Sequence, residues 1–246
     1  MGGGAPPLAV DARFPIKSGT ALPHPQPLPA GEGILKEETT MITIYHVPHS
    51  RSLRVVWLME ELGEDYRVEQ LTIPIPEEFK KVNPLGSVPT IEDDGPDGRI
   101  VMFESLAILQ YITGRRIPAS LTITTGPSPD PAAYAEHLQF LHFGEADLAT
   151  PIGTIFRTRV FTGEQTNATI EDQLGQLRKR LAYLDDHLAD GREWVTGAKF
   201  TIADISIGYA FDLLEFTRVE CELPPHVAAY WARLRDRPAF HRAAAR

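Results

Sequence analysis

The segments Asn83-Pro84-Leu85-Gly86-Ser87-Val88-Pro89-Thr90-Ile91 and Ile100-Val101-Met102-Phe103-Glu104-Ser105 decide the fold of this chain. Pro89 follows the β-branched Val88 and leads into an apolar strand. A cis bond before Pro89 would turn Val88 outward and leave its backbone polar groups free to pair with a peptide-like ligand. Ser105 opens a helix, so its hydroxyl, its amide and the helix dipole would face an anion. The two segments together predict a site for a short acidic peptide.

Strands and helices around these segments follow the order β-α-β and then β-β-α. Apolar periodicity and turn residues predict strands at 41–45, 66–72, 88–91 and 99–103, and helices at 52–62 and 105–113. Gly63 and Gly114 are expected to close the two helices. With a proline that would be cis before the third strand, this order resembles a thioredoxin-like domain.

A second motif lies far along the chain, where the pattern is helical throughout. Thr201 is expected to cap a helix, Asp204 to reach back to it, and Phe200 to pack against Ile205. The cytosolic glutathione transferases of bacterial type carry the same capping box in the middle of their helical domain. From Met41 to the C-terminus the chain resembles that family, which implies an α/β thioredoxin-like N-terminal domain followed by an all-α C-terminal domain.

Composition shifts divide the chain at three places. Residues 1–40 are rich in proline and lack an apolar period, which predicts a disordered extension. It is either a flexible tail or upstream sequence translated by mis-annotation, with Met41 as the physiological start. The thioredoxin-like domain is expected at 41–117, a proline-rich linker at 118–130 and the helical domain at 131–246. Within that last part we predict helices at 132–158, 170–188, 202–216, 226–235 and after Pro238, with Asp130 capping the first.

The composition fits an ordinary cytoplasmic enzyme. Of the 246 residues, 43% are hydrophobic, which is enough for two modest domains. A net charge of -9 argues against a nucleic-acid partner. Cys221 is the single cysteine, so an intrachain disulfide and a multi-cysteine metal site are excluded. No apolar run approaches the roughly 20 residues that span a membrane, so no membrane association is expected.

The chemistry is expected in the turn Tyr45-His46-Val47-Pro48-His49-Ser50-Arg51-Ser52. A glutathione thiol with a pKa of about 8.5 needs help to ionise at neutral pH, and a hydroxyl at a helix N-terminus can supply it. Ser50 and Ser52 both qualify, and His49 could donate to the thiolate. The family uses a Tyr, Ser or Cys in this turn. Its cysteine would fall at Arg51, so this chain departs from the cysteine pattern.

Each residue of this turn also has a plainer interpretation. Ser52 could be only the helix N-cap, Ser50 a turn former and His49 a solvated side chain. Arg51 and Arg54 could bind glutathione carboxylates or pair with acidic neighbours, for which the sequence offers Glu60, Glu61 and Asp65.

The resemblance also implies the residues that bind glutathione. Glu104 would hold the γ-glutamyl ammonium, or it is merely a carboxylate at a strand end. The expected glutathione-binding set is Ser87, Val88, Pro89, Glu104, Ser105 and Arg51.

Two clusters that look like metal sites are set aside, so no metal cofactor is expected. His137 and His142 lie about 140° apart around one helix, and they cannot easily face one ion. The acidic run Glu92-Asp93-Asp94 is typical of a hairpin turn. Trp57, Trp194 and Trp231 are expected in the core.

The resemblance implies a detoxifying glutathione transferase that conjugates its co-substrate glutathione to a small electrophilic hydrophobic molecule and forms a homodimer. A pocket for the second substrate is expected on the first long helix, lined by Tyr134, Phe140, Leu141, Phe143 and Gly144. Two alternatives stay open: a glutathione-dependent disulfide or peroxide reductase on the same fold, and a non-catalytic interaction protein.

Overall fold

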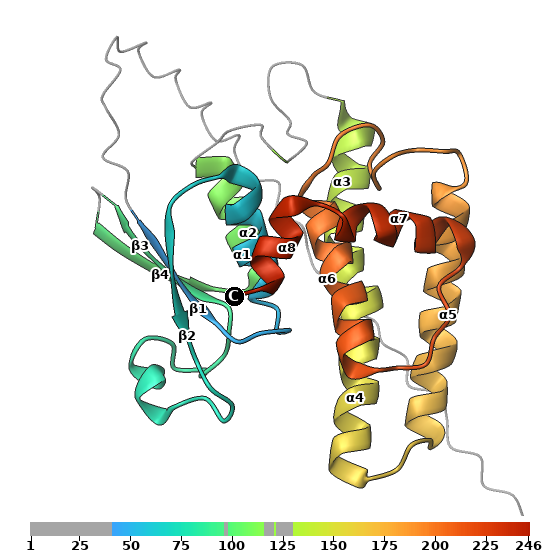
Figure 1. Ribbon diagram of the computed structural model, residues 1–246, viewed down its shortest axis with the longest axis horizontal. Coiled ribbons are helices and arrows are strands. Elements are labelled where there is room, and N and C mark those ends of the chain that lie inside the picture. Colours follow the sequence, from blue (N-terminus) through green and yellow to red (C-terminus); the bar gives the residue numbers. More distant parts are fainter. Residues whose placement is uncertain (1–40, 96–97, 116–120, 122–129) are drawn as a thin grey trace, which may run out of the picture. The chain divides into compact units, whose positions relative to one another are not determined.

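The computed structural model describes residues 41–95, 98–115, 121 and 130–246 (Figure 1). The predictions for residues 1–40 and for most of the linker lie outside the described residues.

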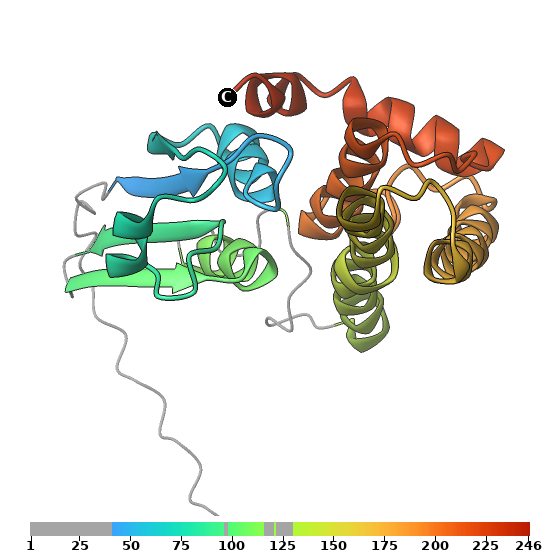
Figure 2. The same ribbon diagram turned by 90° about the horizontal axis from the view of Figure 1, so that it is seen from below.

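The first part of the described chain is a four-stranded sheet with two helices. Its strands have the order β2-β1-β3-β4; β1 and β2 are parallel, and the other pairs are antiparallel. Figures 1 and 2 show α1 and α2 on the same face of the sheet. The elements, in chain order, are β1 (Ile42–His46), α1 (Leu53–Leu62), β2 (Tyr66–Gln70), the 3-10 helix η1 (Glu77–Lys81), β3 (Thr90–Gly95), β4 (Gly98–Phe103) and α2 (Ser105–Arg115). This arrangement confirms the predicted β-α-β and β-β-α order.

Local sequence explains the ends of β1 and α1. Ile42, Ile44 and His46 alternate onto the buried face of the sheet, as a strand period of two requires. Gly63 ends α1 in the left-handed conformation with φ 68°, and its N–H donates to the Met59 carbonyl. Gly114 does not end α2, which continues to Arg115, so that predicted stop was wrong.

The second part of the described chain is helical. It contains α3 (Pro131–Phe143), the π-helical segment η2 (Gly144–Ala149), α4 (Thr150–Thr162), α5 (Ala168–Leu188), α6 (Ile202–Thr217), α7 (Pro225–Arg235) and α8 (Pro238–Ala244). The single helix predicted at 132–158 is a longer run that a π-helical segment interrupts. Asp130 caps α3 as predicted, because its Oδ1 accepts the N–H groups of Ala132 and Ala133 at 3.0 Å.

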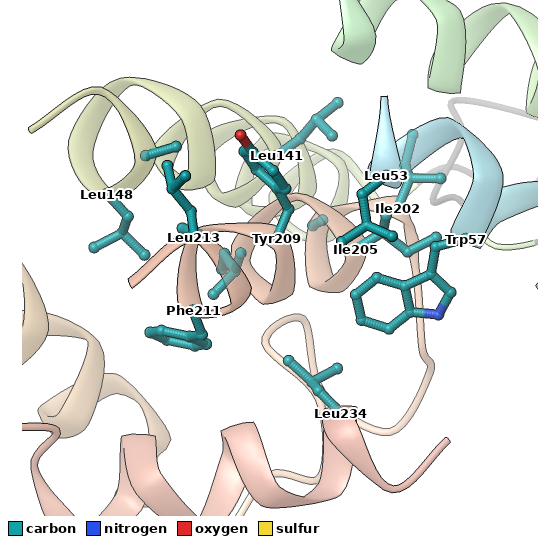
Figure 3. Packing of buried hydrophobic residues seen from close by; sticks show 14 of the residues in the cluster. Leu53, Trp57, Leu141, Leu148, Ile202, Ile205, Tyr209, Phe211, Leu213 and Leu234 are labelled. Atoms are coloured by element: carbon teal, nitrogen blue, oxygen red, sulfur yellow. The ribbon is translucent and has the colours of Figure 1, made fainter. Parts of the chain in front are cut away.

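Helix α6 lies at the centre of one hydrophobic core that includes residues of both parts. Figure 3 shows Leu53 and Trp57 of α1 beside Ile202 and Ile205 of α6. A methyl group at Gly208 would lie 2.7 Å from the Trp57 ring, so the glycine leaves room for the indole. All three tryptophans are buried, as predicted.

The predicted capping box begins α6. The Thr201 N–H donates to Asp204 Oδ2 at 2.8 Å, and the Ala203 N–H donates to Thr201 Oγ1 at 3.3 Å. Asp204 also accepts from the Val195 N–H at 2.9 Å and the Tyr230 hydroxyl at 2.7 Å. Burial raises the pKa of Asp204, and its hydrogen bonds oppose that rise. The box therefore joins α6 to α7 inside the core.

Candidate functional site: the turn between β1 and α1

The turn that follows β1 is held by backbone hydrogen bonds. The Ser50 N–H donates to the Val47 carbonyl at 3.2 Å, and the Leu53 N–H donates to the Ser50 carbonyl at 2.9 Å, which starts α1. His49 between them has φ 56°, a left-handed conformation that is uncommon outside glycine and is often found at functional sites. Ser52 occupies the N-cap position of α1, but its side chain makes no capping bond.

Ser52 is fully buried and bonds inside the turn. Its Oγ lies 2.7 Å from Ser50 Oγ and 2.8 Å from His46 Nδ1, and it accepts the Val47 N–H at 3.2 Å. Ser50 is half-buried and forms the outer end of this chain of side chains. Of the two serines proposed for the thiolate, Ser50 is therefore the one with exposed surface.

His46 lies at the buried end of this series of hydrogen-bonded side chains. It is 1% exposed, and burial lowers its pKa to about 4 although a hydrogen bond to the backbone of Arg246 works in the opposite direction. The imidazole is therefore neutral at neutral pH.

His49 is paired with the helical part of the protein. Its Nδ1 lies 3.2 Å from Asp212 Oδ2 of α6, and its ring stacks on Phe216 with centroids 4.2 Å apart and planes 10° apart. The ring centroid of Phe216 in turn lies 6.4 Å from that of Phe156 in α4. Burial raises the pKa of Asp212, while the bond to His49 opposes that rise. The interpretation of His49 as a merely solvated side chain was wrong.

Arg51 and Arg54 meet on one carboxylate, that of Glu145 in η2. Arg51 donates to Glu145 Oε1 from Nε at 2.8 Å and from Nη2 at 2.6 Å, and Arg54 Nη1 donates to Oε2 at 2.5 Å. Burial would raise the pKa of Glu145, but the two guanidinium groups lower it to about 2. Neither arginine pairs with the acidic neighbours that the sequence offered, Glu60, Glu61 and Asp65.

Arg54 also connects this turn to Ser105. Its guanidinium is fully buried, and Nη1 donates to Ser105 Oγ at 3.1 Å. The guanidinium carbon lies 4.3 Å from the centroid of the Tyr209 ring. Glu104, exposed beside Ser105, has φ 75°. Arg54 thereby brings the two parts of the predicted site together.

The loop before β3 has the predicted backbone form. The Val88–Pro89 bond is cis, and Asn83 Nδ2 donates to the Ser87 carbonyl at 3.0 Å. Val88 is half-buried, and no other described residue forms a hydrogen bond with its N–H or its C=O. A free backbone donor and acceptor at this point is what the sequence led us to expect.

The predicted second-substrate residues lie mostly inside the helical part. Leu141 is fully buried, Phe140 is 1% and Phe143 is 8% exposed, and a methyl group on Gly144 would lie 2.5 Å from Ser206 Oγ. Only Tyr134 is half-exposed. Burial gives the other four a packing role, and the pocket assignment stays a prediction.

Sequence reasoning missed Asp212, Glu145 and Phe216, because each acts through a contact distant in sequence. It also missed His46, although the partner Ser52 is near in sequence. One signal was available: Asp212 is an acid in the otherwise apolar stretch 207–214, where an unpaired carboxylate would be costly.

The described residues contain neither a metal-ligand cluster nor a helix that could span a membrane. No group of three or more His, Cys, Asp or Glu among them could hold a metal ion. Within the same ranges, no helix has the length and apolar character needed to cross a membrane.

A mixed sheet with a cis-proline loop before β3, followed by a set of helices, defines the class of thioredoxin-like proteins with an all-helical second part. The sequence matches the N-terminal domain of glutathione S-transferases over residues 50–115 and the C-terminal domain over residues 146–238. The chain belongs to the glutathione S-transferase family.

Individual relatives agree with this assignment. Glutathione S-transferase 3 of Schizosaccharomyces pombe is 27% identical over 223 residues, which cover 83% of this chain and 87% of the relative. Glutathione S-transferase GstA of Escherichia coli O157:H7 is 26% identical over 204 residues, covering 79% and 93%.

Two solved structures share the fold and contain ligands. A glutathione transferase family member from Pseudomonas fluorescens pf-5, with two glutathione bound, has a TM-score of 0.71 and 27% identity, and the match covers 83% of this chain and 92% of that one. A glutathione transferase from Burkholderia graminis, with two glutathione molecules per subunit, has a TM-score of 0.68 and 25% identity, covering 83% and 87%.

Proposed function

We propose that this protein is a glutathione transferase that conjugates the glutathione thiol to a small electrophilic hydrophobic molecule. The observation that carries the proposal is the position of Ser50. It is half-buried at the N-terminus of α1 and fixed by a 2.7 Å contact with Ser52, and Arg54 of the same helix donates to Ser105.

Glutathione would bind along the cis-proline loop and the start of α2. The N–H and C=O of Val88, which no other described residue engages, are suited to pair with the peptide backbone of the ligand. The amide and hydroxyl of Ser105, at a helix N-terminus, suit a carboxylate, and the exposed Glu104 suits an ammonium group. Ser87 and Pro89 flank the loop, and Arg51 lies on the facing turn.

The bound thiolate would be stabilised by Ser50. A hydroxyl that donates to an anionic sulfur contributes about 1.5 to 3 kcal/mol, and the dipole of α1 adds about 0.3 to 1 kcal/mol. His49 lies next to Ser50 on the same turn and is a further candidate donor.

The electrophile would contact the aromatic stack formed by His49, Phe216 and Phe156. Phe216 is 50% exposed and Phe156 is 37% exposed, which is unusual for phenylalanine in a folded domain. An apolar surface beside the thiolate favours flat, hydrophobic substrates. Tyr134 on α3 is the remaining candidate from the predicted pocket.

Ser50→Ala tests the proposal. We expect glutathione affinity to stay within about twofold, since the ligand-binding loop is untouched, and the pKa of the bound thiol to rise by about one to two units. Ultraviolet absorbance of the thiolate gives the pKa, and calorimetry gives the affinity. Wild-type protein that binds no glutathione would contradict the proposal.

A reductase is the second candidate function. The two ligand-bound relatives hold two glutathione molecules each, and such a site suits attack of one thiolate on a mixed disulfide, which yields a free thiol and glutathione disulfide. No protein cysteine is required. Assays with a model aryl halide, a hydroperoxide and a mixed disulfide, each with glutathione, separate the two functions.

Light scattering tests the expected homodimer against the mass of one 27.3 kDa chain.

A further inference from the structure

Three side chains form a continuous chain of hydrogen bonds from the core to the candidate catalytic residue. His46 Nδ1 lies 2.8 Å from Ser52 Oγ, and Ser52 Oγ lies 2.7 Å from Ser50 Oγ. His46 and Ser52 are buried, whereas Ser50 keeps exposed surface. The direction in which the protons of this chain point decides what Ser50 offers to a ligand.

His46 fixes the inner end. Its imidazole is neutral at neutral pH and therefore carries one N–H. The hydrogen bond to the backbone of Arg246 favours the protonated ring and therefore uses an N–H donor. Because Nδ1 faces Ser52 Oγ at 2.8 Å, we assign that N–H to Nε2, which leaves Nδ1 as an acceptor. The neighbouring His49 further disfavours a second proton on the His46 ring.

The bonds of Ser52 then follow from its valence. A hydroxyl donates one hydrogen bond and accepts two. The single Ser52 proton has two acceptors within reach, His46 Nδ1 at 2.8 Å and the Val47 carbonyl at 3.2 Å, and it goes to the nearer one. Ser52 also accepts the Val47 N–H at 3.2 Å, so its remaining position accepts from Ser50. Ser50 also accepts the Ser52 N–H at 3.3 Å. In the free protein the Ser50 proton consequently points inward.

We propose that His46 is a positioning residue that acts through Ser52 and keeps the Ser50 proton turned inward, so that Ser50 offers a bound thiol an oxygen lone pair rather than a proton. This inference rests on the proposed function, since its effect is felt by a bound thiol. To donate to a thiolate, Ser50 has to give up its bond to Ser52. His46 therefore keeps the pKa of the bound thiol higher than the turn alone would allow.

Replacing His46 with leucine tests this direction. Without the Nδ1 acceptor, the Ser52 proton is divided between the Val47 carbonyl at 3.2 Å and Ser50 Oγ at 2.7 Å. Whenever it turns to Ser50, the Ser50 proton is released toward the sulfur. We expect His46→Leu to lower the pKa of bound glutathione by about half to one unit, the equivalent of one neutral hydrogen bond. A residue needed only for packing would raise this pKa or weaken glutathione binding instead.

The double variant shows whether the effect passes through Ser50. In a Ser50→Ala background, His46→Leu should leave the thiol pKa unchanged. An equal shift in both backgrounds overturns the proposal, as does an unchanged or raised pKa in the single variant. If His46→Leu does not fold, Ser52→Ala cuts the same chain and should lower the thiol pKa as well.

Nitrogen NMR of the free protein gives a second readout that needs no ligand. His46 should show an unprotonated Nδ1 and a protonated Nε2 at pH 7, and a protonated Nδ1 would overturn the proposal. Calorimetry on the wild type separates the two failures. Absence of glutathione binding rejects the proposed function and this inference together, whereas normal binding with the wrong pKa shift rejects this inference alone.

Discussion

Arg54 Nη1 donates to Glu145 Oε2 at 2.5 Å, and this bond joins the first helix of the thioredoxin-like part to the π-helical segment of the helical part. The guanidinium has no exposed surface, so it depends on this carboxylate to offset the loss of its hydration. The same guanidinium supports Ser105. The pair is therefore a structural element on which the candidate ligand site rests.

Glu145→Gln should destabilise the protein by about 3 to 5 kcal/mol, because it leaves a buried cation without a counter-charge. Urea unfolding at pH 7 measures the loss. Glu220→Gln, at an exposed position in the 218–224 loop, is the control and should stay within about 0.5 kcal/mol of wild type.

The stability contributed by Glu145 should fall as the pH is lowered. The pKa of Glu145 is about 2 in the folded protein and 4.5 as a reference, so its contribution is complete above pH 4.5 and is lost as the pH falls toward 2. The gap between wild type and Glu145→Gln should narrow over that range. A gap that stays constant down to pH 2 would contradict the ion-pair explanation.

Gly144→Ala should destabilise the protein by about 1 to 3 kcal/mol. The new methyl group would lie 2.5 Å from Ser206 Oγ and 2.7 Å from the Ile207 nitrogen, and the backbone of α6 cannot move aside freely. Gly153→Ala is the matched control in α4. Nothing lies within 4 Å of its methyl position, so we expect a gain of up to about 1 kcal/mol from helix propensity. Thermal melts of the two variants should shift in opposite directions.

Asp204→Ala should lower the free energy of unfolding by roughly 3 to 5 kcal/mol. It leaves the buried N–H groups of Val195 and Thr201 and the Tyr230 hydroxyl without their acceptor. Tyr230→Phe removes only one of these donors and should cost about 1 kcal/mol. Guanidinium unfolding ranks the two. An equal loss in both variants would show that the box does not act as the centre of this network.

His46 and His137 predict a loss of stability in mild acid. Burial lowers the pKa of each to about 4, below the reference value of 6.5. Stability from these groups is complete above pH 6.5 and falls between pH 6.5 and 4, where the unfolded chain binds up to two more protons, with a slope of up to about 2.7 kcal/mol per pH unit. Urea midpoints at pH 7, 6 and 5 check this. His137→Phe should halve the slope, and an unchanged slope would exclude His137 as a contributor.

Much of the fold could be predicted because it depends on short-range signals. The cis-proline loop, the strand alternation of β1, the Gly63 stop and the Thr201–Asp204 box each involve residues within a few positions of one another. The π-helical segment could not be predicted, because no local residue pattern marks an extra residue in a helical turn. Its effect is to place Glu145 against two arginines about 90 positions earlier.

The candidate site was predictable in its ligand-binding loops and less so in its chemistry. The turn lies between β1 and α1 as predicted, and its catalytic role stays a prediction. The partners of His49, Arg51 and Arg54 come from helices far along the chain. Periodicity also selected Leu141 and Gly144 for a pocket, since a buried helix face and a ligand-lining face have the same spacing.

The packing of Trp57 against Gly208 has a consequence for how the protein melts. Domain families match the two parts of the sequence separately, yet the largest side chain of α1 fills space inside the helical part. If either part unfolded, the other would expose its side of this contact, either the Trp57 indole or the α6 surface at Gly208. Calorimetry should therefore show a single heat-absorption peak, with a van't Hoff enthalpy equal to the calorimetric one, and the sequence boundary should leave no trace in the thermogram.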